Sequence, residues 1–455
     1  MGPSGLNNTP SLRLSGILFG MVLLLCALIP AGCIPPSQRI RLANDSTGLL
    51  RRVYDMRISG ADGENTPPIL LMSDRGEIMP GPGGKALTLR FELHSERVPN
   101  LVLQLVHCDR NWRPTENAFV QDPVRLRSNE FQIEYSPLGV RTYTHQVSIT
   151  FPGSSSFFRI QHSGHYLARV LDYDDPSQKL GEVRFFVVET RSAVGLSIIS
   201  DFYRSGQTDL SQQGWKILAE AETAAGLFGT QVAGIELYQS GQWYDGVRAG
   251  PFGDAMEFTP GQPTIRWSNS IGKIYATFSN IPAGNEHRIL DLTDVLYYPT
   301  TGGVISTPLS DQIRRGFDLY DNDGYAITRP VPASDADFVP FEFRLDLQGY
   351  EVDKDIFVVG TFNNWRILPE WQLRFDPESR SYKARGLLRR AVHEYEYRAG
   401  TWDSATATLK GADASLLEGN VRKASPLYYA FVVYAETASG GYDRLVGVGS
   451  SSIRE

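Results

Sequence analysis

The sequence has 455 residues, enough for about two to four domains with buried cores of their own. Hydrophobic residues make up 42% and charged residues 21%, a composition that excludes a disordered chain and a single long coiled coil. Lys and Arg total 44 against 51 Asp and Glu, and no run of basic residues offsets the net charge of −7. We therefore expect no nucleic-acid partner.

The first 32 residues are predicted to be an export signal. A mostly apolar run from Ile17 to Ile29 fits the central region of a secretory signal and is too short to span a bilayer comfortably. Ala31 and Gly32 precede Cys33, and a Pro-rich tether at 33–44 follows, which resembles a bacterial lipoprotein cleavage site. The resemblance implies lipidation of Cys33 and membrane attachment through its acyl chains. Plain cleavage for export and an uncleaved anchor are the alternatives.

Apolar and polar residues alternate repeatedly in the rest of the chain, the pattern of half-buried antiparallel strands. Leu87–His94 alternates at every position, and Phe341–Leu347 and Tyr395–Arg398 repeat the pattern. Apolar runs such as Phe185–Val188 predict strands that are buried on both faces. Residues 215–225 have a helical composition, but their apolar residues alternate, so we predict a strand there.

Strands at this spacing, separated by turn residues, predict an all-β protein of serial immunoglobulin-like or early-set β-sandwich domains. We expect an N-terminal β-sandwich at 45–190, a middle β-rich domain at 195–335 and a C-terminal early-set-like sandwich at 338–455. Prolines and acidic residues between 327 and 338 indicate a hinge before the last domain.

Residues that could carry catalysis or bind a metal are sparse. The seven histidines form no metal-ligand grouping, and the sequence contains no G-x-S-x-G, P-loop or H-E-x-x-H motif. We therefore predict no enzyme, no catalytic residue, no metal site and no cofactor.

The cysteines give no intramolecular disulfide once Cys33 is acylated. Cys26 lies in the signal, so Cys108 alone remains in the mature chain. Cys108 ends an apolar run, and burial statistics favour a half-buried thiol over a reactive one. Trp112, which follows closely, is predicted to close one end of the N-terminal sandwich.

One C-terminal segment is similar to the early-set sandwich of glycogen-binding modules and branching enzymes. Val358–Trp365 and His393–Trp402 carry the similarity. It implies that Trp365 and Trp402 stack on sugar rings, because an indole face packs on the apolar face of a sugar. A carbohydrate-binding envelope lipoprotein that uses these two tryptophans is therefore the alternative function.

A set of segments in fixed order resembles the type IX secretion system plug protein family across almost all of the mature chain. The N-terminal domain carries most of this resemblance, and the middle and last domains contribute one segment each. These segments are Val106–Asp109, Asn111–Thr115, Tyr143–His145, Gly164–Val170, Thr264–Trp267 and Phe362–Trp365.

This resemblance implies a non-enzymatic protein of the cell envelope on the periplasmic side of the outer membrane. Its partner would be the large outer-membrane β-barrel translocon of that system, which it closes when no cargo occupies the pore. A stopper needs bulk and rigidity, and serial β-sandwiches supply both. A hydrolase of envelope polysaccharide is a third class, supported only by the shared sandwich fold.

Overall fold

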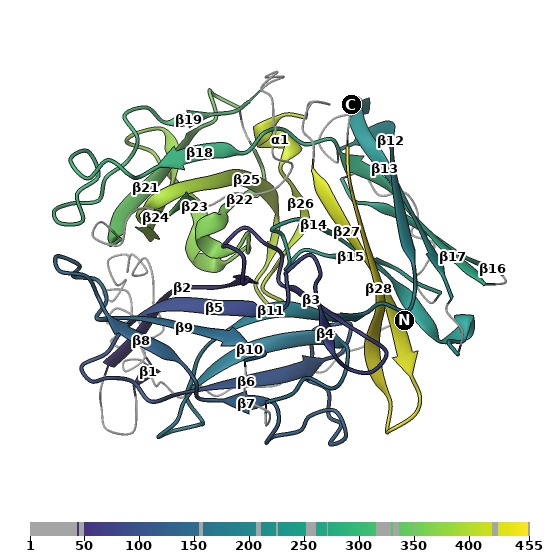
Figure 1. Cartoon of the computed structure of the whole chain (residues 1–455). Coiled ribbons are helices and arrows are strands. Elements are labelled where there is room, and N and C mark those ends of the chain that lie inside the picture. Colours follow the sequence, from purple (N-terminus) through teal and green to yellow (C-terminus); the bar gives the residue numbers. More distant parts are fainter. Residues whose placement is uncertain are drawn as a thin grey trace, which may run out of the picture. The chain divides into compact units, whose positions relative to one another are not determined.

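The computed structural model describes residues 43–44, 50–153, 158–205, 211–223, 226–251, 261–270, 272–314, 329–330, 336–350, 352–420 and 426–453. All of these ranges belong to one compact unit, Gln38–Glu455, which is separate from Met1–Ser37. The predicted all-β fold is confirmed (Figure 1). No helix in the described ranges is long and apolar enough to cross a membrane.

The first sandwich consists of a five-stranded and a six-stranded sheet. The five-stranded sheet has the order β1 (Ala43–Asn44), β2 (Leu50–Gly60), β5 (Leu87–His94), β9 (His145–Phe151), β8 (Gln132–Tyr135). The six-stranded sheet has the order β4 (Ile78–Met79), β3 (Ile69–Met72), β11 (Lys179–Glu189), β10 (Gly164–Asp172), β6 (Leu101–Cys108), β7 (Arg127–Ser128).

The alternation along the sequence decides which side chains of the first sandwich enter its core. Leu87, Leu89, Phe91 and Leu93 of β5 are fully buried between the two sheets, as the period of two predicts. The apolar strand β11 serves two cores, because Phe185 and Val187 face the first sandwich while Phe186 and Val188 face outward. Phe186 and Val188 are nevertheless fully buried, so another part of the chain covers that face.

The middle sandwich supplies that cover. One of its sheets has the order β12 (Val194–Arg204), β13 (Ser211–Glu222), β17 (Lys273–Pro282), β16 (Thr264–Ser270). The other has the order β15 (Val247–Ala249), β14 (Val232–Gln239), β27 (Leu427–Glu436), β28 (Tyr442–Ser452). The strand predicted near 215–225 is confirmed as β13, whose buried Ile217 and Ala219 alternate with more exposed residues.

The last sandwich is one nine-stranded sheet that folds over its own core. Its main path is β18 (Arg288–Asp291), β25 (Ala391–Asp403), β22 (Asp355–Gly360), β23 (Gln372–Asp376), β24 (Ser381–Arg389), β21 (Phe338–Asp346), β19 (Asp311–Gln312). β20 (Arg329–Pro330) and β26 (Thr408–Asp413) also pair with β25. The helical elements are short: η1 (Gly229–Gln231), η3 (Thr361–Asn363), η4 (Pro369–Trp371) and α1 (Ser415–Glu418).

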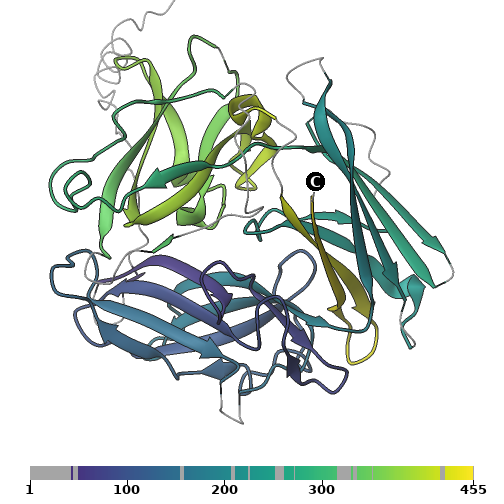
Figure 2. The ribbon, with the colours of Figure 1, turned by 45° about the horizontal axis from the view of Figure 1, so that its top comes forward.

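Four strand pairings cross the predicted boundary between 335 and 338: β14 with β27, β18 with β25, β20 with β25 and β19 with β21. The hairpin of β27 and β28, at the C-terminal end of the chain, pairs with β14 and completes the middle sandwich. β18, from the range assigned to the middle domain, pairs with β25 of the last sandwich. Figure 2 shows the yellow C-terminal hairpin beside teal strands of the middle sandwich. The three residue ranges remain a prediction. Strand β18 from the range 195–335 belongs to the last sandwich, and strands β27 and β28 from the range 338–455 belong to the middle sandwich.

Candidate functional site

The segment after β6 is a hydrogen-bonded turn that folds back on the end of β6. One carboxylate oxygen of Asp109 accepts the backbone N–H groups of Asn111 at 2.8 Å and Arg113 at 2.9 Å. Trp112 has a φ of 61°, a left-handed conformation that the surrounding hydrogen bonds maintain. The motif that carried the family resemblance therefore presents Arg110, Asn111 and Trp112 in fixed positions.

These presented residues bind the middle sandwich. Arg110 donates from its backbone N and from Nε to Oδ2 of Asp443 on β28, both at 2.8 Å. Arg248 on β15 donates to the carbonyl of Arg110 at 2.9 Å and to the side chain of Asn111 at 2.8 Å. Burial alone would raise the pKa of Asp443, but the hydrogen bonds from Arg110 hold it below its ordinary value. We call this contact the first joint.

Trp112 packs within this joint. Its ring lies 4.8 Å from the ring of His165 and 5.3 Å from that of Phe186, with the guanidinium of Arg184 4.3 Å from its centroid. The prediction that Trp112 closes one end of the first sandwich was wrong, because its side chain packs on the outer sheet face that the middle sandwich covers. His165 is fully buried and hydrogen-bonds Glu236 of β14 at 2.8 Å.

Cys108 is an unreactive thiol. It is fully buried at the end of β6, and burial, followed by the charge of Asp109, raises its pKa to about 12. The predicted position at a strand end is confirmed, but the thiol is fully buried and not half-buried as expected.

A second joint connects the first and last sandwiches through buried charges. Arg389 at the end of β24 lies 3.5 Å from Asp55, 3.3 Å from Glu64 and 4.0 Å from Glu92. Burial and then the nearby Asp55 raise the pKa of Glu92 to about 8, because the more distant Arg389 does not offset them. Glu92 is 3% exposed.

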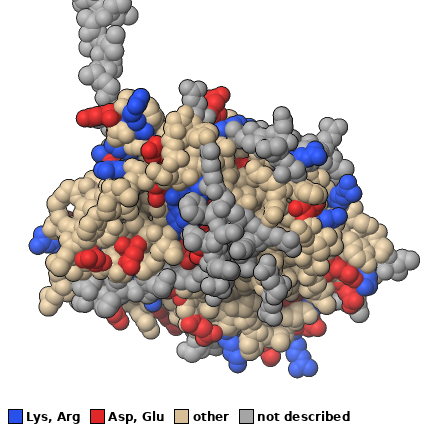
Figure 3. All heavy atoms as spheres, turned by 90° about the horizontal axis from the view of Figure 1, so that it is seen from above, with Lys and Arg blue, Asp and Glu red and all other residues tan. Residues whose placement is uncertain are grey.

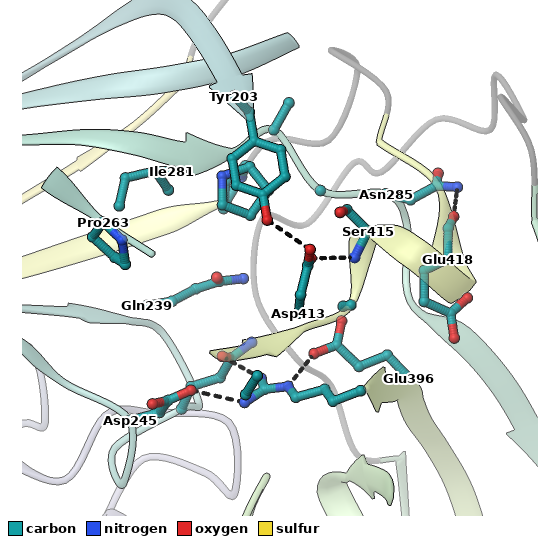
Figure 4. Close-up of a pocket in the computed structure, with 18 of the residues that line it drawn as sticks. Tyr203, Gln239, Asp245, Pro263, Ile281, Asn285, Glu396, Asp413, Ser415 and Glu418 are labelled. Atoms are coloured by element: carbon teal, nitrogen blue, oxygen red, sulfur yellow. Dashed lines mark hydrogen bonds and ion pairs between the residues drawn. The ribbon is translucent and has the colours of Figure 1, made fainter. Parts of the chain in front are cut away.

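A polar cavity of about 210 Å³ lies between the middle and last sandwiches. Figure 4 shows Tyr203 of β12 and Ser415 of α1 directed at Asp413 of β26. The Tyr203 hydroxyl donates to Oδ2 of Asp413 at 2.7 Å, and the backbone N–H of Ser415 donates to its Oδ1 at 2.8 Å. Both oxygens of this carboxylate are therefore occupied.

The other charges of the cavity are paired as well. Arg398 of β25 donates to Asp245 at 2.8 Å, to Gln242 at 2.7 Å and to Glu396 at 2.7 Å. Burial alone would lower the pKa of Arg398, but the charges of Glu396 and Asp245 raise it. Glu418 accepts from Arg288 at 2.9 Å, although burial keeps its pKa raised.

Like the first two joints, the cavity is lined by ion pairs and hydrogen bonds, and we call it the third joint. The carboxylates of Asp245, Asp413 and Glu418 bind arginine or tyrosine side chains of other elements, and Glu396 binds Arg398 of its own strand. A general base needs a carboxylate within reach of a substrate proton, and each of these four has a hydrogen-bond partner within the protein. Within the described ranges, no group of three or more His, Cys, Asp and Glu side chains is placed to hold a metal ion.

Trp365 and Trp402 do not share a surface. Trp365 follows Gly360 at the end of β22, is 3% exposed, and packs 4.4 Å from the ring of His287. Trp402 lies at the other end of β22, where its backbone N–H donates to Asp355, and its half-buried ring packs 5.0 Å from Phe357. Trp365 is therefore buried at one end of β22, and Trp402 is half-buried at the other. Cys33 lies outside the described residues.

The joints were not visible in the sequence. Arg110 and Asp443 are 333 positions apart, and His165 and Glu236 are 71 apart. Only the motif around Cys108, with its unusual cluster of Asp, Arg, Asn and Trp, marked one side of the first joint.

Fold and joints together define an all-β protein of several sandwiches held in one compact unit by buried ion pairs. Residues 74–189 match the family model described as "Type 9 secretion system plug protein 1st domain". The match contains β5, β6, β10 and β11 of the first sandwich and the whole motif of the first joint. The chain therefore carries a first domain of the type IX secretion system plug family, which confirms the resemblance over this segment.

One solved structure supports the fold. A hypothetical protein from Parabacteroides merdae is similar with a TM-score of 0.66 and 20% identity, over 88% of this chain and 97% of that one. A marsupial T cell receptor is matched at a TM-score of 0.15 and 12% identity, over 87% of this chain and 100% of that one, too low to carry an argument. The first similarity shows a shared fold. No curated protein matches the chain.

Proposed function

We propose that this protein is a non-enzymatic plug that closes the outer-membrane translocon of the type IX secretion system when no cargo occupies the pore. The observation that carries the proposal is the match of residues 74–189 to the first domain of the plug family. We place the protein in the cell envelope, on the periplasmic side of the outer membrane, anchored by lipid at Cys33.

The joints support this role physically. A stopper must keep its shape against a wide opening, and hinge motion between domains would let solutes pass. Ion pairs of one buried and one half-buried side chain, Asp443 with Arg110 and Arg389 with Glu64, tie the first sandwich to both others. Breaking a buried ion pair is costly, so the sandwiches are expected to move as one body.

The surface charge agrees with a protein partner. On the face seen in Figure 3, Lys and Arg atoms alternate with Asp and Glu atoms among neutral ones, without an extended field of either sign in the coloured part. Such a mixed surface suits a reversible polar contact, whereas an anionic polymer would need a basic field.

Deletion of the gene in the native bacterium tests the proposal. We expect a hydrophilic reporter too large for porins to enter the periplasm of the deletion strain, and the intact chain to restore the barrier. The Cys33→Ser variant should restore it only in part, because the plug would lose its high local concentration at the membrane. Unchanged reporter entry in the deletion strain would contradict closure.

A further inference from the structure

Two loops from different sandwiches each display a leucine almost fully to solvent. Leu138, in the loop between β8 and β9, is 99% exposed, and Leu296, in the loop between β18 and β19, is 90% exposed. Tyr135 beside the first and Tyr297 beside the second are 75% and 46% exposed. We call these four residues the tip patch. Clustered exposed apolar side chains of this size mark contact surfaces.

Both loops hold their leucines in ordered turns. The backbone N–H of Val140 donates to the carbonyl of Pro137 at 3.2 Å, and Gly139 between them has a φ of 100°, which a side chain would strain. In the second loop, Oδ1 of Asp294 accepts the N–H groups of Leu296 at 2.9 Å and Tyr297 at 3.1 Å. A partner that binds these tips would therefore lose little conformational entropy from ordering them.

One chain of hydrogen bonds fixes both loops to the same corner. The carboxylate of Asp337 accepts the N–H of Thr142 at 3.3 Å, and the Asp337 carbonyl accepts the N–H of Arg390 at 2.9 Å. Arg390 then donates to the carbonyl of Tyr298 at 2.6 Å, next to the tip patch. Figures 1 and 2 both show the β8–β9 and β18–β19 loops reaching the same side of the unit.

The charges around the tip patch select the partner. Loops 136–144 and 292–310 contain no lysine and two charged residues, Arg141 and Asp294. Glu134 and Asp291, both exposed, flank the loops, so acidic groups outnumber basic ones. An acidic border opposes an anionic lipid surface and a second copy of itself, and it complements a protein recess bordered by Lys and Arg.

We infer that the tip patch is the docking surface for the translocon, with Leu138 and Leu296 inserted into apolar recesses that basic residues border. This inference rests on the proposed function and names the residues that make the contact. Apolar anchors at the centre of an interface carry most of the binding energy, while the charged rim sets orientation and association rate.

The test measures binding of the full chain to translocon barrel purified without its plug in detergent, by biolayer interferometry. The Leu138→Asp/Leu296→Asp variant should lose at least about tenfold in affinity. The matched control is Phe119→Asp/Val124→Asp, which changes two apolar residues, each 74% exposed, on the loop between β6 and β7. The control should bind as the wild type does, and wild-type affinity should fall as salt rises.

Each outcome decides the inference. Selective loss in the tip variant, with an unfolding midpoint equal to that of the wild type, supports docking through the tip patch. If the tip variant binds as the wild type does, or if the control variant loses as much affinity as the tip variant, the tip patch is not the docking surface. The proposed function would still stand in either case. Absence of wild-type binding overturns both. Binding to phosphatidylethanolamine–phosphatidylglycerol vesicles that only the tip variant loses would assign the patch to lipid and overturn the inference.

Discussion

Arg110 donates two hydrogen bonds of 2.8 Å to one carboxylate oxygen of Asp443, although 333 positions separate the two residues. Asp443 lies in β28, at the C-terminal end of the chain, and Arg110 lies in the turn after β6 of the first sandwich. The pair therefore joins the motif after β6 in the segment that matches the plug first domain to β28 of the middle sandwich.

The Asp443→Asn substitution should weaken the first joint. Arg110, which is half-buried, would lose the opposite charge of Asp443, and we expect a fall in the free energy of unfolding of about 1–3 kcal/mol. Chemical denaturation followed by far-UV circular dichroism measures the change. Asp403→Asn, which removes the charge partner of the exposed Lys410, is the matched control and should leave the midpoint unchanged. Equal midpoints for Asp443→Asn and wild type would contradict a structural role for the pair.

The second joint predicts a specific pH dependence. Since the folded pKa of Glu92 is about 8 against an ordinary value of 4.5, the folded state keeps a proton that the unfolded chain releases. Its contribution to stability is full below pH 4.5 and is lost as the pH rises to about 8.

The Glu92→Gln variant isolates this contribution, because glutamine stays neutral. It should exceed the wild type in the free energy of unfolding by about 5 kcal/mol above pH 8, with the difference shrinking toward pH 5. Thermal unfolding of both proteins across this range gives the comparison. A wild type that gains stability relative to the variant as the pH rises would show that Glu92 is ionised and paired in the folded state.

The two tryptophans of the last sandwich should differ in their effects on stability. Trp365→Ala removes a side chain that is 3% exposed and should cost about 3–5 kcal/mol. Trp402→Ala removes a half-buried ring and should cost about 1–2 kcal/mol. Guanidinium denaturation measures both, and titration with α-glucans followed by tryptophan fluorescence should show no saturable binding. Saturable binding abolished in Trp402→Ala would revive the carbohydrate-binding alternative.

Cys108 should resist thiol reagents in the folded protein. The variant Cys26→Ser/Cys33→Ser leaves Cys108 as its one thiol. Because burial raises the pKa of this thiol to about 12, Ellman's reagent at neutral pH should label it only after denaturation. Rapid labelling of the native variant would contradict the buried position at the end of β6.

Local patterns predicted the strands well, because successive side chains of a strand point to opposite faces of the sheet. The alternation in Leu87–His94 places four apolar side chains in one core, as β5 confirms. The apolar run in β11 correctly indicated burial on both faces. It could not indicate what covered the outer face, since the covering residues Phe431 and Leu445 come from the end of the chain.

Pairing between distant parts of the chain explains where the structure differs from the sequence-based predictions. The return of β27 and β28 to β14 joins residues about two hundred positions apart, and strand periodicity contains no record of such a partner. The role of Trp112 was missed for the same reason, because its contacts to His165 and Phe186 form a face that only the middle sandwich buries. Trp365 looked like a surface aromatic in its motif, yet η3 and His287 enclose it.

Ionic conductance through the purified translocon in a planar bilayer tests the central claim most directly. With the translocon open and free of cargo, addition of the wild-type chain to the periplasmic side should reduce the large conductance to near the bilayer background, reversibly on washing. A conductance that stays unchanged at saturating concentrations of the folded chain would contradict closure of the pore by this protein.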